Sequence, residues 1–272
     1  MLRQRVLVAA VLLPVGLWIF SVGGWLYAAA MALVLGLAAA EYARLFRFGG
    51  SRPAAPLIVA GTVGLALARH AWRFEFSDLL LAGSALAVMG WHLVDYERGA
   101  PSSATDFGIS LGGLVYLGFV GAFLVSLRDL PEGWGWLLIS LPAVWIGDSA
   151  AYFVGRAIGR HKMSPRLSPN KSWEGYAAGI VAAALGGALM AFVYVRFGGA
   201  GIVVTPGRGL ILGLVLGLIT PLGDLGISMM KRQFRVKDTG TLLPGHGGVL
   251  DRIDSWLWAG VLGYYLTVLM IG

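Results

Sequence analysis

Residues 174–195 read EGYAAGIVAAALGGALMAFVYV and contain one charged residue, Glu174, at their start. An α-helix rises about 1.5 Å per residue, so about 20 apolar residues cross a hydrocarbon core about 30 Å thick. Because unsatisfied backbone polar groups are costly in lipid, a run of this length predicts a membrane-spanning helix. This stretch therefore places at least part of the chain in a lipid bilayer.

Similar runs recur along the 272-residue chain, which is 57% hydrophobic and 13% charged and has a mean hydropathy of +0.76. Soluble domains average about 25% charged residues. We therefore predict an all-α, polytopic integral membrane protein with about nine transmembrane helices. The expected spans are 6–22, 25–43, 54–70, 77–94, 107–126, 134–154, 174–195, 208–229 and 252–271.

Basic residues are distributed unevenly between the loops. With nine spans, 16 of the 21 Lys and Arg residues fall on the N-terminal side of the membrane and five on the other. The positive-inside rule then predicts a cytoplasmic N-terminus in a multi-pass protein of the cell inner (plasma) membrane. Retention of loops in the cytoplasm and anionic headgroups also account for the net charge of +7, so nucleic acid is not an expected partner.

Composition limits the chemistry as well. Cysteine is absent, which excludes disulfides, thiolate catalysis and Cys-ligated zinc. Residues 1–140 are apolar helices with short loops, expected to act as a scaffold and candidate dimer contact. Most of the notable polar groups follow in residues 141–272, which we predict to be the catalytic region.

Four carboxylates stand inside or at the edge of the C-terminal spans, namely Asp148, Asp224, Asp251 and Asp254. A charge at membrane depth is costly unless it is paired, so each is a functional candidate. Asp148 shares a helix face with Arg156, and a structural ion pair is the alternative there. For Asp254 the alternative is a capping role at the start of the last helix.

Lysines gather near these acids. All four lysines of the chain, Lys162, Lys171, Lys231 and Lys237, fall in the two basic loops expected in the cytoplasm. The carboxylates lie within the helices and the basic residues lie in the adjoining loops. This arrangement favours a bound Mg²⁺, which prefers carboxylates and substrate phosphate oxygens as ligands. We therefore expect a magnesium-dependent site for a phosphorylated substrate.

A glycine-rich turn, PGHGG at 244–248, lies between the second basic loop and the last helix. Gly247 and Gly248 allow backbone amides to approach an anion closely. His246 could contact a phosphate or shuttle a proton, and a capping or structural role is its alternative.

The stretch 228–254 reads S-M-M-K-R, four residues, and then K-D-T-G-T-L-L-P-G-H-G-G-V-L-D-R-I-D. It resembles the signature of the phosphatidate cytidylyltransferase family. GDSAAYFVGRAIGRHKMSPRLSPNKSWEG at 147–175 and LGDLGISMMKR at 222–232 are similar to further motifs of that family, so the resemblance covers roughly residues 145–255. The family often has an acidic residue where Ile227 stands here, which leaves a carboxylate role at that position open.

The resemblance implies transfer of a cytidylyl group from CTP to phosphatidic acid, giving CDP-diacylglycerol and pyrophosphate for phospholipid biosynthesis. It implies a polar site open to the cytoplasmic leaflet, in a homodimer surrounded by the lipid bilayer. The metal candidates are Asp224, Asp251 and Asp254, around Mg²⁺, with K⁺ as one candidate for a second cation. The catalytic candidates are Asp224, Asp251, Lys231 and His246. The substrate-binding candidates are Lys171, Ser172, Arg232, Lys237, Asp238, Gly247, Gly248, Arg252, Asp148 and Arg156.

Three other functions share parts of this pattern. A CTP-dependent lipid kinase would use a similar polar membrane site but would deliver the γ-phosphate to an alcohol. A CDP-alcohol phosphotransferase would need a D-G-x-x-A-R pattern, and the chain contains no Asp-Gly pair. A transporter would usually show related halves and polar breaks near the midplane, whereas the charges here gather in one half. Cytidylyl transfer is therefore the preferred hypothesis.

Overall fold

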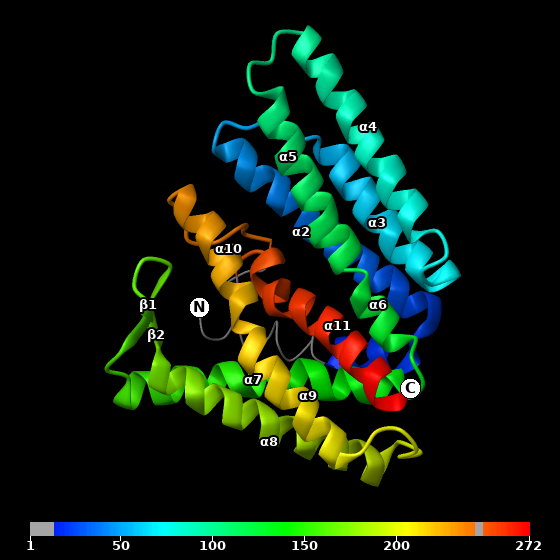
Figure 1. Ribbon diagram of the computed structural model, residues 1–272, viewed down its shortest axis with the longest axis vertical. Coiled ribbons are helices and arrows are strands. Elements are labelled where there is room, and N and C mark those ends of the chain that lie inside the picture. The colour runs from blue at the N-terminus through cyan, green and yellow to red at the C-terminus, as the bar shows by residue number, and fades with distance from the viewer. Residues whose placement is uncertain (1–13, 243–246) are drawn as a thin grey trace. The chain divides into compact units, whose positions relative to one another are not determined.

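The computed structural model describes residues 14–242 and 247–272, and most of them are helical (Figure 1). The helices are α2 (Gly24–Phe48), α3 (Ala55–Trp72), α4 (Ser77–Glu97), α5 (Ser103–Gly113), the π-helix η1 (Leu114–Val120), α6 (Phe123–Arg128), α7 (Gly133–Ile158), α8 (Trp173–Phe197), α9 (Pro206–Ile219), α10 (Pro221–Gln233) and α11 (Leu250–Ile271). Residues 14–22 are helical too, and strands β1 (Lys162–Ser164) and β2 (Ser168–Ser172) form a hairpin.

Eight helical segments of the described residues are long and apolar enough to cross a membrane. They coincide with the eight expected spans from 25–43 onward, with ends that differ by a few residues. The remaining expected span, 6–22, lies partly outside the described residues, which include its residues 14–22, and these are helical. The prediction of an all-α polytopic membrane protein is confirmed.

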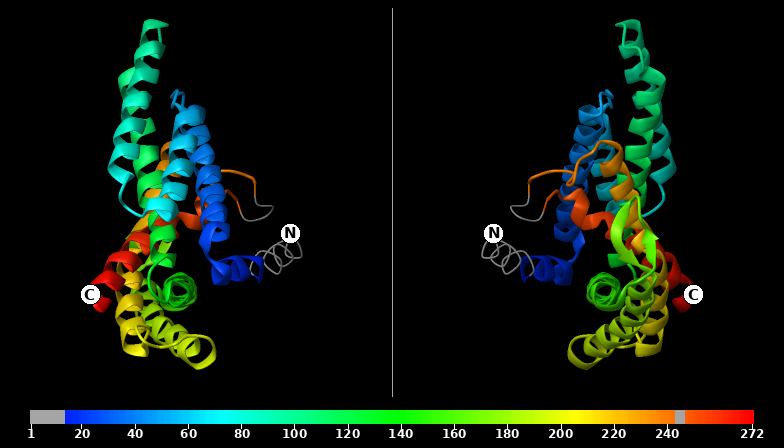
Figure 2. Two further views of the ribbon diagram at one scale, coloured as in Figure 1. Left: turned by 90° about the vertical axis from the view of Figure 1, so that its right-hand side faces the viewer. Right: turned by 90° about the vertical axis from the view of Figure 1, so that its left-hand side faces the viewer.

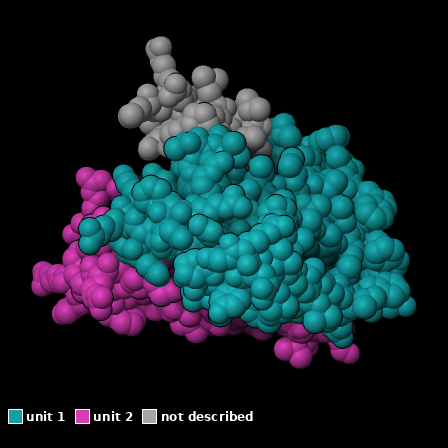
Figure 3. Space-filling view, turned by 90° about the horizontal axis from the view of Figure 1, so that it is seen from above, with its two compact units in different colours: residues 1–126, 231–253 teal, residues 127–230, 254–272 magenta. Residues whose placement is uncertain are grey.

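The chain divides into two compact units, which Figure 3 colours separately. Unit 1 comprises residues 1–126 and 231–253, of which residues 14–126, 231–242 and 247–253 are described. Unit 2 comprises residues 127–230 and 254–272. The segment that follows α10 thus belongs with the N-terminal helices rather than with the helices next to it in the sequence.

In unit 1, helices α2 to α5 run alongside one another (Figures 1 and 2). The core of unit 1 is mostly aliphatic, and Leu35, Ile58 and Leu114, the first residue of η1, are fully buried in it. Ser110 of α5 joins the elements by polar bonds: its hydroxyl donates to Asp106 O at 2.7 Å and accepts from the backbone N of Ala54 at 2.9 Å.

In unit 2, helices α7, α8 and α9 pack closely because small residues stand where they meet. A Cβ atom added to Gly147 of α7 would lie 3.1 Å from Gly179 O of α8. One added to Gly209 of α9 would lie 2.5 Å from Gly187 O of α8, which is too close for a real contact. Close backbone approach through small residues is how membrane helices commonly associate.

The β-hairpin joins α7 to α8 and is a structure that the sequence did not predict. Its strands pair antiparallel, with Lys162 opposite Ser172. Glu174, in the first turn of α8, accepts a hydrogen bond from the His161 backbone N at 3.1 Å and lies 2.6 Å from His161 Nδ1. These contacts fasten the start of the hairpin to the start of α8.

The long helical segment 206–233 is interrupted at one residue. α9 ends at Ile219 and α10 begins at Pro221, so Thr220 separates the two helices. Proline has no N–H to donate to the preceding turn. Thr220 takes up part of the local hydrogen bonding, since its hydroxyl donates to Leu216 O at 2.8 Å.

Candidate functional site

The Asp251 cluster, in unit 1, consists of Glu41, Lys231, Thr239, Gly248 and Asp251. Asp251 stands in the first turn of α11, and its side chain is only 4% exposed. Its Oδ1 accepts from Lys231 Nζ at 2.6 Å. Its Oδ2 accepts from the Thr239 backbone N at 2.8 Å, from Thr239 Oγ1 at 3.0 Å and from the Gly248 backbone N at 3.1 Å. Both oxygens of this carboxylate are therefore bonded.

Local structure explains why these groups meet. Lys231 lies in the last turn of α10, and the chain then returns to the start of α11. Gly247 has a φ of +82°, a value that side-chain-bearing residues rarely adopt, and it immediately precedes the amide that bonds Asp251. The helix dipole also favours a carboxylate in the first turn of α11.

Glu41 is the member of this cluster that the sequence analysis missed. It lies in α2, its side chain is buried, and its Oε2 accepts from the Leu250 backbone N at 2.9 Å and from Thr239 Oγ1 at 3.1 Å. A signal was available, because Glu41 is a carboxylate inside an expected membrane span. The prediction applied that criterion only to the C-terminal spans.

The Asp224 cluster, in unit 2, consists of Asp148, Lys171, Asp224 and Ser228. Lys171 Nζ lies 2.5 Å from Asp224 Oδ2, and the Ser228 hydroxyl is 3.4 Å from Asp224 Oδ1. Lys171 and Asp224 are also the charged groups that act on Asp148. The structure thus brings two predicted carboxylates, from α7 and α10, to one lysine on β2.

The Lys171–Asp224 pair is more open than the Lys231–Asp251 pair. The exposed fractions are 27% for Lys171 and 36% for Asp224, against 13% for Lys231 and 4% for Asp251. Water competes with an exposed ion pair, so the Asp224 pair should contribute little to folding. Its residues are correspondingly available to a ligand.

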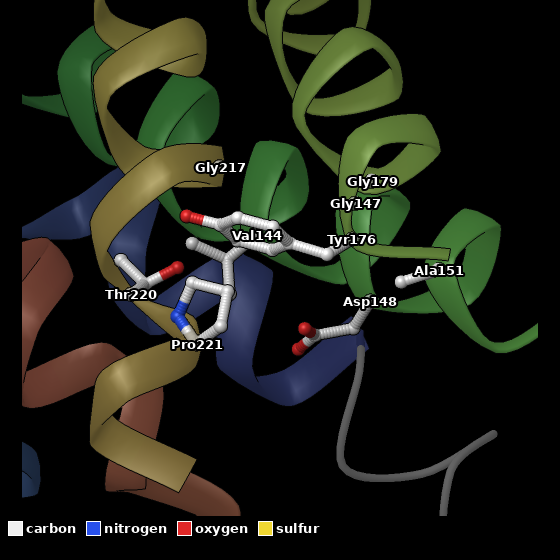
Figure 4. Close-up of a pocket in the computed structure, with 9 residues that line it drawn as sticks. All are labelled: Val144, Gly147, Asp148, Ala151, Tyr176, Gly179, Gly217, Thr220 and Pro221. Atoms are coloured by element: carbon white, nitrogen blue, oxygen red, sulfur yellow. The ribbon is translucent and has the colours of Figure 1, made fainter. Parts of the chain in front are cut away.

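Asp148 also lines a small pocket between α7, α8 and the α9–α10 break (Figure 4). The Tyr176 ring crosses this pocket, and its hydroxyl donates to Leu218 O at 2.6 Å. The pocket volume is about 20 Å³, about enough for one water molecule. Sites for small molecules usually measure about 300–1,000 Å³, so this pocket cannot by itself hold a nucleotide.

The other predicted residues have varied surroundings. Arg156 donates to Tyr152 Oη at 3.3 Å, so the predicted face of α7 has a polar pair at its end. The Ser172 hydroxyl caps α8 by accepting from the Gly175 N at 3.2 Å. Asp254 is buried, and its Oδ1 accepts from the Ser255 N at 2.6 Å. Arg156 is exposed, as are the candidates Arg232, Lys237, Asp238 and Arg252. His246 lies outside the described residues.

Whether these groups suit a cation can be judged from their donors and acceptors. Among the described residues, no three His, Asp or Glu side chains are gathered as a ready-made metal site. Mg²⁺, however, is often held by one or two carboxylates together with substrate phosphates. Asp224 and Asp251 each hold a lysine ammonium, a positive group that a hard cation could replace. The two carboxylates therefore fit such a cation in charge and chemistry.

Comparison with known proteins assigns the chain to a family. The profile of the cytidylyltransferase family matches residues 3–270. The chain belongs to this family. It is 39% identical to a phosphatidate cytidylyltransferase of Brucella suis biovar 1, over 97% of this chain and 92% of that protein. Proteins of the same name from Pseudomonas aeruginosa and Synechocystis sp. are 36% and 33% identical, over 94% and 98% of this chain and 93% and 97% of their own length.

The extent of these matches exceeds the resemblance seen in the sequence. That resemblance covered roughly residues 145–255, whereas the family profile begins at residue 3 and so includes the N-terminal helices. The helix that carries Glu41 is therefore part of what this chain shares with the family. As a cytidylyltransferase, the protein is a nucleotidyltransferase and an enzyme of the membrane.

Proposed function

We propose that the protein transfers the cytidylyl group of CTP to phosphatidic acid, forming CDP-diacylglycerol and pyrophosphate. The observation that carries this proposal is that relatives named phosphatidate cytidylyltransferases match this chain over more than nine-tenths of both lengths. The two Lys–Asp clusters support it, because a reaction between two polyanions needs cationic groups and carboxylates that can hold a metal ion, and each cluster contains both.

In the proposed reaction a phosphate oxygen of phosphatidic acid forms a bond to the α-phosphorus of CTP. The bond from that phosphorus to the oxygen bridging to the β-phosphate breaks, and pyrophosphate leaves with the electron pair. The attacking phosphate is already anionic, so no general base and no covalent enzyme intermediate are required. The protein's task is to align two anions and to offset their repulsion.

We assign Lys231 and Lys171 to phosphate contacts, and we assign Asp251 and Asp224, each within its own cluster, to holding Mg²⁺. The metal, when bound, would neutralise charge on the phosphates. An ammonium released from its carboxylate partner becomes available to a phosphate oxygen, which couples cation binding to substrate binding in each cluster. Removal of divalent cations with EDTA should abolish turnover, and added Mg²⁺ should restore it.

The surroundings of the enzyme follow from the same proposal. A bacterial enzyme of phospholipid synthesis that takes CTP from the cytoplasm would reside in the inner membrane with its polar groups facing the cytoplasm. The basic loops support that orientation by the positive-inside rule. We also propose that the protein is a homodimer, which cross-linking in native membranes would test.

The reaction itself can be tested with purified protein in detergent, phosphatidic acid, Mg²⁺ and CTP labelled separately at the α- and γ-phosphates. With α-labelled CTP, we expect the label to enter the lipid. With γ-labelled CTP, we expect the label to appear in pyrophosphate and the lipid to remain unlabelled. In a parallel assay with diacylglycerol in place of phosphatidic acid, entry of γ-label into the lipid, with release of CDP, would instead identify a CTP-dependent lipid kinase. Absence of transfer with every divalent cation would contradict both functions.

A further inference from the structure

Glu41 is a buried carboxylate that the proposed chemistry does not yet use. Only 6% of the residue is exposed. Its Oε2 holds two donors, the Leu250 backbone N and the Thr239 hydroxyl, while Oε1 has no hydrogen-bond partner among the described residues. Burying a carboxylate in this way is costly, so a role for its charge is to be expected.

The Thr239 hydroxyl lies between two carboxylates. Its oxygen is 3.1 Å from Glu41 Oε2 and 3.0 Å from Asp251 Oδ2. A hydroxyl has one proton to donate, and an ionised carboxylate can only accept. The hydroxyl can therefore bond one carboxylate fully or divide its proton between both. Glu41 thus gives this hydroxyl an alternative to Asp251.

Close packing keeps Glu41 in this place. A Cβ atom added to Gly240 would lie 2.5 Å from Glu41 Oε1, and one added to Gly248 would overlap Glu41 Oε2. Because both positions are glycine, the backbone can pack directly against the Glu41 carboxylate. Gly248 also donates its N–H to Asp251 Oδ2, so the same backbone touches both acids.

We propose that Glu41 is a positioning residue for Asp251. It holds the Leu250 amide at the start of α11, and it accepts the Thr239 hydroxyl when that hydroxyl leaves Asp251 Oδ2. The carboxylate of Asp251 can then release a donor in favour of a cation without leaving the hydroxyl unbonded. The inference rests on the proposed function, since Asp251 is assigned there to holding Mg²⁺.

The test compares Glu41→Gln, Thr239→Val, Thr239→Ser and the double variant Glu41→Gln/Thr239→Val. The Glu41→Gln change keeps the shape of the side chain but removes its negative charge, so the remaining oxygen is a weaker acceptor for the Leu250 N–H and the Thr239 hydroxyl. We expect Glu41→Gln and Thr239→Val each to lower kcat about tenfold and to raise the Mg²⁺ concentration that gives half-maximal activity. Thr239→Ser, which keeps the hydroxyl, should stay near wild type. The double variant should be no worse than the poorer single variant, because both changes interrupt one chain of bonds.

A second measurement does not depend on turnover. Limited trypsin digestion at Arg235 and Lys237, followed by mass spectrometry, reports how firmly the segment between α10 and α11 is held. We expect faster cleavage in Glu41→Gln than in wild type. The matched control is Glu97→Gln, an exposed glutamate at the end of α4, which should change neither cleavage nor activity.

The proposal would be overturned if Glu41→Gln had the kcat and the Mg²⁺ dependence of the wild type. It would also be overturned if the fold-loss of kcat in the double variant equalled the product of the two single fold-losses. If Glu41→Gln does not fold, Thr239→Val decides the matter, and unchanged Mg²⁺ dependence in that variant would overturn it. Failure of the wild type to transfer label would contradict the proposed function instead. Even if the wild type transfers no label, faster tryptic cleavage in Glu41→Gln than in wild type would support the positioning role of Glu41. Unchanged cleavage would overturn that role.

Discussion

Asp251 accepts four hydrogen bonds from an almost fully buried position, and this makes its charge hard to replace. We expect Asp251→Asn to lower kcat at least about 100-fold, because the amide leaves Lys231 without a counter-charge and presents an NH₂ group to donors. Breaking one partner of a buried pair typically costs about 3–5 kcal/mol, so Tm should fall as well. Turnover and Tm in detergent are the measurements.

The control for this variant is Glu75→Gln, which changes an exposed carboxylate in the turn between α3 and α4. Glu75→Gln should leave both turnover and Tm unchanged. Activity of Asp251→Asn within about twofold of wild type would contradict the assignment of Asp251 to the metal.

Lys171 should behave differently, because its ion pair with Asp224 is partly exposed. We expect Lys171→Met to change Tm little, since exposed pairs contribute about 0–1 kcal/mol. It should nevertheless lower kcat/KM for CTP at least about tenfold, because the ammonium near two carboxylates is lost. Steady-state kinetics and a thermal melt on one preparation separate the two effects.

Lys162→Met is the matched control, since Lys162 is an exposed lysine on the other strand of the same hairpin. Equal losses of kcat/KM in Lys171→Met and Lys162→Met would show that the overall charge of the hairpin matters and not Lys171 in particular. A wild-type kcat/KM in Lys171→Met would show that Lys171 is not part of the site.

At the residue scale, the sequence indicated Lys231 and Asp251 but not what holds them. The spacing of residues in a motif does not reveal which backbone amides meet a carboxylate. Thr239 and Gly248 do so because the chain after α10 turns back to the start of α11. Glu41 is 198 positions from Thr239, and no local pattern joins two residues so far apart.

The carboxylate of Glu132 binds the connection between α8 and α9. This residue precedes α7 and accepts from the backbone N atoms of Ile202 at 3.2 Å, Val203 at 3.0 Å and Val204 at 2.7 Å. Burial by itself would raise the pKa of Glu132, but the backbone hydrogen bonds from this loop outweigh it and hold the pKa below its ordinary value.

A carboxylate with a lowered pKa stabilises the folded state above its unfolded pKa and loses that contribution as the pH falls through the folded pKa. We expect Glu132→Gln to destabilise the protein by about 1–2 kcal/mol at neutral pH. The Tm difference from wild type should shrink as the pH falls below the ordinary titration range of glutamate. Melts in detergent across that range measure it, and a difference that grows toward acid pH would contradict the prediction.

At the scale of elements, apolar periodicity predicted the long helices but not their interruptions. A span of apolar residues meets the requirement of the bilayer whether its backbone is α-helical throughout or changes to the π form, as at Leu114–Val120. The hairpin was missed for another reason. Contacts between His161 and Glu174, which stand 13 positions apart in the sequence, hold the base of the hairpin.

For the molecule as a whole, residues 1–140 emerge as more than a scaffold. Unit 1 combines α2 with the segment after α10, and Glu41 of α2 bonds Thr239 and Leu250 on the other side of that contact. The N-terminal helices therefore contribute directly to the surroundings of Asp251. A variant of the C-terminal half expressed alone would lack this contact and should be inactive.

The orientation of α8 in the membrane can be predicted from its length and from the charges at its two ends. α8 has 25 residues, enough to cross the hydrocarbon core, so the hairpin before it and the loop 198–205 after it should lie on opposite sides. The hairpin carries several bases and the loop carries none, which predicts a cytoplasmic hairpin. Because the chain has no cysteine, Ser164→Cys and Ala200→Cys report each side without background.

An impermeant maleimide should label Ala200→Cys in intact spheroplasts and Ser164→Cys only after the membrane is opened. The unaltered chain should remain unlabelled and is the natural control. The reverse pattern would contradict the cytoplasmic orientation and with it the access of cytoplasmic CTP to Lys171. Labelling of both cysteines from one side would contradict α8 as a membrane span, because a single crossing must separate its two ends.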